Sequence, residues 1–266
     1  MMTMYPSQLQ RWSLLIVIFW GLSAQCQQLT IAAAADLQPV MQDVSSAFEK
    51  DSGTAVKVSY GSSGNFTQQI KNGAPFDIFF SANLDYAKEL ELSGFSEPGT
   101  LYKYAVGKIV IWAPAESKLE LNSGMRVLLN PAITKIAIAN PQHAPYGQAA
   151  VAALQNENLY DQVKAKLVLG ENISQTMTFV MSGSADVGIV ALSLALSPNI
   201  KDKGRYAQIP DSDYSPIEQA CIVLRSSKNK DLAKRFVAFL NTPKIRESFR
   251  RYGFELPQAQ ATGSVK

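Results

Sequence analysis

The chain has 266 residues, of which 47% are hydrophobic and 18% are charged, enough apolar material for one large domain or two modest lobes. Its 25 basic and 22 acidic residues give a formal net charge of +3, and no run of like charges stands out. A protein that binds nucleic acid through a basic stripe is therefore not expected.

The first residues predict export from the cytoplasm. Arg11 precedes an apolar stretch over residues 12–22, and small residues follow it. This order is typical of a secretory signal peptide, and the stretch is shorter than the roughly 20 residues that span a bilayer. We therefore predict a signal peptide over residues 1–26 and an exported mature chain. The alternative is an N-terminal membrane anchor, which includes a lipoprotein attached through Cys26.

Strands and helices alternate along the first half of the mature chain. An apolar run over residues 29–34 predicts a strand, and apolar side chains at helical spacing predict a helix from Leu37 to Lys50, with Asp36 at its N-cap position. The alternation continues with a strand at 56–60, a helix at 65–72 and a strand at 77–80. This order predicts a parallel sheet with helices on both faces.

The second half repeats this alternation. It is predicted to contain strands at 135–140, 167–170 and 186–190, and helices at 148–156 and 173–182. Long apolar runs at 104–113 and 217–224 predict further strands, and residues 230–250 predict a helical tail. The one cysteine outside the signal region, Cys221, is expected to be a buried strand residue without chemistry.

The predicted fold is α/β with two lobes, each a mostly parallel sheet flanked by helices, and two crossover strands form the hinge near Gly107 and Ser215. The predicted boundaries place residues 27–107 and 215–257 in lobe 1, residues 108–214 in lobe 2, and residues 258–266 in a loose tail.

Four strand-to-helix elbows carry the predicted chemistry. They are Ala35-Asp36, Ser62-Ser63, Pro145-Tyr146 and Glu171-Asn172-Ile173, two from each half of the chain. Ligands of open α/β sheets bind at such elbows, where helix N-termini offer unpaired N–H groups and partial positive charge. Neutral donors of this kind suit a small, fully ionised tetrahedral oxyanion. Taken alone, the Gly-Ser-Ser-Gly segment is more readily explained as an ordinary turn.

Six sequence blocks carry a resemblance to a known family. They are residues 32–37, 60–64, 69–82, 139–147, 188–191 and 251–254. These blocks resemble the periplasmic molybdate-binding proteins of ABC importers, in consistent order from about Leu29 to Phe254. The Gly-Ala-Pro-Phe-Asp and Asn-Pro-Gln-His-Ala-Pro-Tyr-Gly segments are the most specific.

The resemblance implies a monomeric periplasmic receptor whose lobes close over molybdate or tungstate and which hands the anion to a membrane ABC permease. It implies no enzymatic activity, no cofactor, and no direct protein ligand to the molybdenum. The oxyanion-binding positions of the family fall on Asp36, Ser63, Tyr146 and Ile173, with lesser roles for Ala35, Ser62 and Ala191. Some members carry a tyrosine at the position of Ala191, and here the phenol of Tyr146 is expected to replace it.

Asp36 departs from the family pattern, in which Ser, Thr or Asn usually occupies this position. A carboxylate facing a dianion would be repelled. We expect the Asp36 side chain to turn away and cap its own helix, which leaves only its backbone N–H for the ligand. On this hypothesis Asp36→Asn leaves affinity unchanged or raises it.

Other functions are open to the same residues. The main alternative is a receptor for sulfate, thiosulfate or phosphate, and a phosphate receptor would explain Asp36 as an acceptor for the proton of the ligand. A hydrolase would use His143 as a base near Ser62 or Ser63, but the serines lack the Gly-x-Ser-x-Gly spacing and we expect His143 to be positional. A sensor domain of a regulator is disfavoured by the export signal, and one histidine with one cysteine makes no metal cluster.

Overall fold

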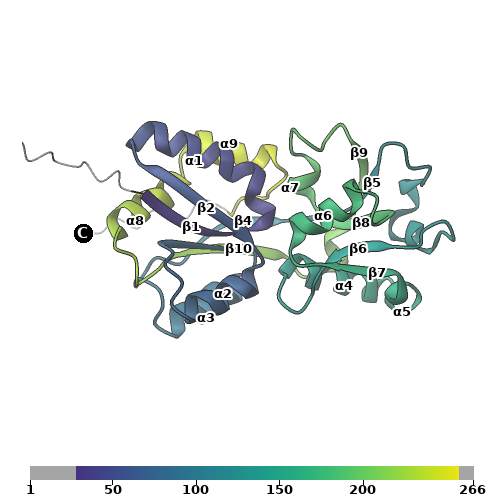
Figure 1. Ribbon diagram of the computed structural model, residues 1–266, viewed down its shortest axis with the longest axis horizontal. Coiled ribbons are helices and arrows are strands. Elements are labelled where there is room, and N and C mark those ends of the chain that lie inside the picture. The colour runs from purple at the N-terminus through teal and green to yellow at the C-terminus, as the bar shows by residue number, and fades with distance from the viewer. Residues whose placement is uncertain (1–27, 258–266) are drawn as a thin grey trace, which may run out of the picture.

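The computed structural model describes residues 28–257, which form two five-stranded sheets with helices packed on them (Figure 1). The predicted signal peptide, Cys26 and the predicted tail at 258–266 lie outside the described residues. No helix within residues 28–257 is long and apolar enough to cross a membrane.

The first sheet is built mostly from the N-terminal part of the chain. Its strands, in spatial order, are β2 (Ala55–Gly61), β1 (Gln28–Ala34), β3 (Ile78–Ser81), β10 (Ile217–Val223) and β4 (Tyr102–Gly107). β1 pairs in parallel with β2 and β3, whereas β10 is antiparallel to both of its neighbours. Four of the five strands therefore run in one direction, as the sequence predicts.

The second sheet repeats this plan. Its strands, in spatial order, are β7 (Leu167–Gly170), β6 (Ile136–Ala139), β8 (Val187–Ala191), β5 (Ile109–Pro114) and β9 (Gly204–Gln208). β5 alone runs against the others, because it is antiparallel to β8 and to β9. β9 was not predicted from the sequence. Its residues are mostly exposed or half-buried, so it lacks an apolar run.

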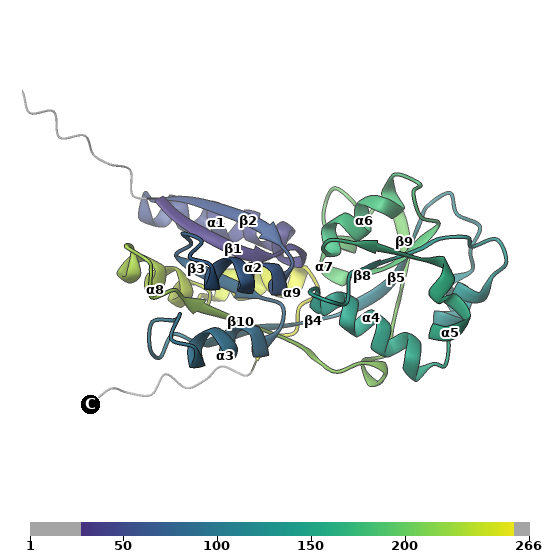
Figure 2. The same ribbon diagram turned by 60° about the horizontal axis from the view of Figure 1, so that its bottom comes forward.

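Helices cover both faces of the first sheet (Figures 1 and 2). One face carries α1 (Gln38–Ser52), α8 (Lys230–Phe239) and α9 (Pro243–Arg251), and the other carries α2 (Ser63–Lys71) and α3 (Leu84–Leu92). Neighbouring strand residues serve opposite faces: Phe80 packs with α1 and α8, and Phe79 packs with α2 and α3. Cys221, in β10, is buried and free, as predicted.

The second sheet lies between α4 (Pro145–Asn156) and α6 (Ile173–Met181), each of which follows a parallel strand. The smaller helices α5 (Tyr160–Val163) and α7 (Leu192–Ala195) complete this lobe. Its core contains Trp112, which is 1% exposed.

The chain crosses between the sheets twice. The strand predicted at 104–113 is in fact two strands, β4 and β5, which belong to different sheets and are separated by Lys108 alone. The return path runs through residues 209–216 into β10. Lys108 forms ion pairs with Asp211 at 2.9 Å and with Glu255 at 2.6 Å, which ties the two crossings together.

The single helical tail predicted at 230–250 is wrong, because α8 and α9 are separate helices. Thr242 is extended (φ −64°, ψ 142°) and Pro243 begins α9. Proline has no N–H to continue the preceding helix and disfavours helical backbone in the residue before it.

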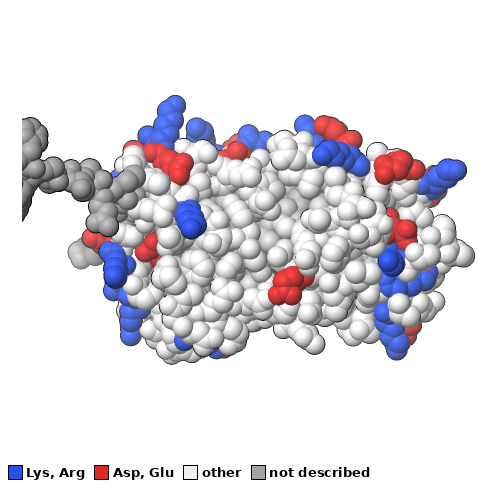
Figure 3. Space-filling model, in the orientation of Figure 1, with Lys and Arg blue, Asp and Glu red and all other residues white. Residues whose placement is uncertain are grey.

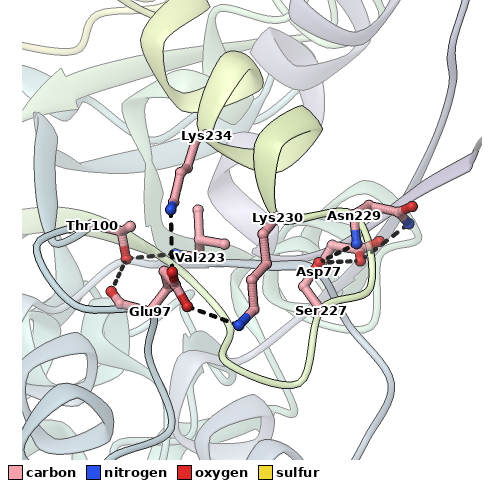
Figure 4. Close-up of polar contacts among 8 residues, drawn as sticks. All are labelled: Asp77, Glu97, Thr100, Val223, Ser227, Asn229, Lys230 and Lys234. Atoms are coloured by element: carbon pink, nitrogen blue, oxygen red, sulfur yellow. Dashed lines mark hydrogen bonds and ion pairs between the residues drawn. The ribbon is translucent and has the colours of Figure 1, made fainter.

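Buried and half-buried acidic residues fasten α8 to the sheet (Figure 4). Asp77 accepts hydrogen bonds from the backbone N–H of Thr30 at 2.7 Å and from Oγ of Ser227 at 2.6 Å. Glu97 pairs with Lys230 and Lys234, whose ammonium groups hold the pKa of the Glu97 carboxyl below its usual value.

Candidate functional site

The four predicted elbows meet at one pocket between the two sheets, whose interior leaves a volume of about 10 Å³ for a water-sized molecule. Twelve residues line it: Ala34, Ala35, Asp36, Gly61, Ser62, Ser63, Ala82, Ala144, Pro145, Tyr146, Asn172 and Ile173. Six of the seven sequence-predicted site residues are among them. Ala191 is buried at the end of β8 and does not line the pocket.

The N-termini of three helices, α2, α4 and α6, line this pocket, and each helix follows a parallel strand of its sheet. The first-turn N–H groups of Ser63, Tyr146 and Ile173 have no partner within their own helices. At α6, the Asn172 side chain caps the N–H groups of the next residues, Ser174 and Gln175, at 3.0 Å each. This cap leaves the N–H of Ile173 for another acceptor.

Ser63 is fully buried at the start of α2. Its Oγ accepts a hydrogen bond from the backbone N–H of Ala82 at 2.9 Å. Since a hydroxyl can also donate one hydrogen bond, the Ser63 hydroxyl hydrogen is available to an acceptor in the pocket.

Asp36 lies in the short 3-10 helix η1 (Ala35–Leu37) and is also fully buried. Its Oδ2 accepts hydrogen bonds from the Tyr146 hydroxyl at 2.9 Å and from Nε2 of Gln219 at 2.7 Å. Its Oδ1 is buried and has no hydrogen-bond partner among the described residues. The expectation that this carboxyl group caps its own helix is therefore wrong, since neither η1 nor α1 has a side-chain cap.

The Tyr146 hydroxyl was expected to reach the ligand, but it donates its proton to Asp36 and accepts a hydrogen bond from Gln219 at 3.0 Å. The donor that Tyr146 offers to the pocket is therefore its backbone N–H. The expectation of a phenolic donor is corrected accordingly.

Gln219 was missed by the sequence analysis. It is fully buried in β10, and its Oε1 accepts a hydrogen bond from the Tyr104 hydroxyl at 2.8 Å. This bond directs Nε2 toward Asp36 and Tyr146. The only sequence signal was a glutamine inside an apolar strand, and such a residue needs buried partners.

Burial dominates the ionisation of this cluster. It raises the pKa of the Asp36 carboxyl to about 6, although the hydrogen bonds from Gln219 and Tyr146 lower it. Burial also raises the pKa values of Tyr146 and Tyr104 well above the usual value of tyrosine. The described residues that line the pocket include no lysine or arginine, so no cation offsets the Asp36 charge there.

The two lobes are closed over the pocket by direct hydrogen bonds. The N–H of Gly64 donates to the carbonyl of His143 at 2.9 Å, and a bond of 2.9 Å joins Nδ1 of His143 to Oγ of Ser62. Oγ of Ser193 donates to the Asp36 carbonyl at 2.8 Å. These contacts give His143 a place in the interface between the lobes.

The Ser62–His143 contact resembles part of a hydrolase site, but the remaining geometry does not fit one. The nearest carboxylate to His143 is Glu171, at 3.7 Å from Nε2, which is beyond hydrogen-bond distance, and its side chain is 58% exposed. Ser62 sits at a Ser-Ser pair rather than in a nucleophile elbow. Within residues 28–257 no group of three His, Cys, Asp or Glu residues could hold a metal ion.

Comparisons with known proteins agree with this geometry. A family model described as bacterial extracellular solute-binding protein matches residues 29–255. The molybdate-binding protein ModA of Azotobacter vinelandii is 37% identical over 234 residues, 88% of this chain and 92% of that protein. The same-named protein of Rhodobacter capsulatus is 32% identical over 255 residues, 95% of this chain and 99% of its own length.

A solved structure is similar over the same region. The periplasmic molybdate-binding protein of Azotobacter vinelandii superimposes with a TM-score of 0.82 at 35% sequence identity, over 86% of this chain and 100% of that one.

Proposed function

Because the chain belongs to the bacterial extracellular solute-binding proteins and its relatives include several molybdate-binding members, we propose that it is a receptor for molybdate. As a member of this family it is a binding protein and not an enzyme. We propose further that it binds tungstate, acts as a monomer in the periplasm, and delivers the anion to an ABC permease.

One observation carries this proposal: four elbows, two from each lobe, surround a single pocket that offers neutral donors and no cation. The N–H groups of Ser63, Tyr146 and Ile173, with the Ser63 hydroxyl, would bind the oxygens of the anion. The metal itself would contact no protein atom. Ala35 and Ser62 line the pocket beside these donors, whereas Ala191 does not line it.

A panel of anions tests the proposal. Thermal denaturation with molybdate, tungstate, sulfate or phosphate should show stabilisation by molybdate and tungstate, because a ligand that binds the folded state raises stability by RT ln(1 + [L]/Kd). Calorimetry then ranks the affinities. If sulfate or phosphate stabilises the protein more than molybdate does, the proposed ligand is wrong.

Paired serine variants test the site. Ser63→Ala removes a pocket hydroxyl and should weaken molybdate binding at least tenfold, which is about 1.4 kcal/mol. Ser45→Ala is the matched control, because Ser45 is a buried serine of α1 outside the pocket. Equal affinities of the two variants would exclude Ser63 as a ligand residue.

Phosphate is a second candidate, and one observation favours it. The unpartnered Oδ1 of Asp36 is an acceptor when the carboxyl is ionised, and it could accept a hydrogen bond from the protonated oxygen of a phosphate ion. Molybdate has no such proton near neutral pH. Two unit charges 4 Å apart repel by about 4 kcal/mol at an effective dielectric constant of about 20, so an ionised Asp36 would oppose a molybdate dianion.

A further inference from the structure

The unpartnered oxygen of Asp36, Oδ1, can take part in a hydrogen bond to the ligand in two ways. It can accept a hydrogen bond from a protonated ligand, or it can carry a proton itself and donate it to the ligand. The structure decides where a protein-bound proton would be. Both donors, the Tyr146 hydroxyl and Nε2 of Gln219, reach Oδ2. A proton on this carboxyl group therefore occupies Oδ1, the atom without a partner.

We propose that Asp36 enters the ligand complex as a neutral carboxylic acid, whose Oδ1–H donates a hydrogen bond to the bound oxyanion. One proton is then taken from solution for each anion bound. The inference rests on the proposed function, since it assigns a role to Asp36 in the same pocket.

Three features of the site support this assignment. Asp36 is fully buried and lines a pocket whose described lining residues include no cation, so a second negative charge there would be uncompensated. A neutral carboxyl group has the shape and the donor–acceptor pattern of a carboxamide, with Oδ2 accepting and Oδ1–H donating. Burial also raises the pKa of Asp36 to about 6 in the described structure, and an adjacent anion raises it further.

Four other titratable groups near Asp36 are too weakly acidic to give up a proton near pH 7. The phenols of Tyr146 and Tyr104 and the thiol of Cys221 have pKa values raised by burial, and that of Tyr214 is raised to about 12. These four groups stay neutral near pH 7. The interface between the lobes also contains His143, bonded to Ser62, and Glu171, which lies 3.7 Å from His143. These two require a control variant.

The experiment is calorimetry of molybdate binding to the full-length mature protein, in buffers of different ionisation enthalpy. Wild type should take up close to one proton per molybdate at about pH 7.5, and its affinity should fall about tenfold per pH unit above about pH 6.5. Asp36→Asn, which mimics the neutral acid, should take up no proton and bind with a flat pH profile.

Matched variants test whether the proton taken up binds to Asp36 or to another titratable group. Asp213→Asn removes another buried aspartate with an unpartnered oxygen, outside the pocket, and should keep the proton uptake of wild type. His143→Gln and Glu171→Gln should keep it as well. Molybdate binding by wild type without proton uptake overturns this inference alone, as does loss of the uptake in His143→Gln or Glu171→Gln.

Two further outcomes would overturn the proposed function as well as the inference. If only phosphate binds, and Asp36→Asn abolishes that binding, Asp36 is an ionised acceptor and both the inference and the molybdate assignment fail. If no oxyanion binds wild type at any pH, the proposed function fails, and the inference fails with it because it requires a bound oxyanion.

Discussion

At Asp36, burial without a cationic partner makes ionisation costly even in the absence of ligand. Its carboxyl pKa of about 6 lies above the value of 3.8 for a free aspartate, so the folded state binds the proton more tightly than the unfolded state. Proton binding by Asp36 therefore stabilises the folded state fully below about pH 4, and this stabilisation is lost as pH rises through about 6. The difference of about two units between the folded-state and free pKa values corresponds to roughly 3 kcal/mol of unfolding free energy.

This difference predicts how the ligand-free protein responds to pH. Asp36→Asn cannot ionise, so its unfolding free energy relative to wild type should rise by roughly 3 kcal/mol between about pH 4 and about pH 7. Urea denaturation of both proteins across this range measures the difference. Comparing the two proteins cancels the other carboxyl groups, such as Glu97 and Asp211, whose pKa values are lowered by lysines. Parallel curves would show that Asp36 ionises normally.

At the scale of elements, the first turn of α2 forms a close backbone contact between the lobes. The N–H of Gly64 bonds to the His143 carbonyl, and a Cβ atom at Gly64 would lie 2.8 Å from that same oxygen and 3.0 Å from the His143 Cα. Backbone atoms cannot move aside as a flexible side chain can. Glycine is therefore required for closure at this position and not for the fold of either lobe.

Gly64→Ala should separate stability from binding. Alanine in a helix stabilises by about 0.5–1 kcal/mol relative to glycine, so the ligand-free variant should be at least as stable as wild type. Its molybdate affinity should fall at least tenfold, because the lobes cannot close fully. Thermal denaturation and calorimetry provide the two measurements, with Gln69→Ala on the exposed face of α2 as control. An unchanged affinity would mean that closure tolerates the methyl group.

The elements also show what the sequence could predict. Periodicity located β7 with the observed bounds and α6 to within one residue at its C-terminal end, because apolar runs and turn residues are local signals. The four elbows could be placed for the same reason. The bonds of Asp36 to Tyr146 and Gln219 could not, because they join positions 110 and 183 residues apart, and only the folded chain brings them together.

For the whole molecule, the distribution of charge predicts how binding responds to salt. In Figure 3 the charged side chains lie mainly around the edges of the visible face, and its middle is largely uncharged apart from an acidic patch. The net charge is only +3, and the described lining of the pocket contains no lysine or arginine. Attraction of the anion therefore depends on short-range backbone and hydroxyl donors inside a closed pocket, where salt screens interactions only weakly.

Molybdate affinity should accordingly change less than about threefold between about 50 mM and 500 mM sodium chloride, a range over which the Debye length falls well below 10 Å. Calorimetry at a constant pH of about 6 measures this dependence while Asp36 is substantially protonated. Sodium chloride is the appropriate salt, because sulfate could compete for the site. A loss of affinity of tenfold or more would mean that surface cations attract the anion over long range.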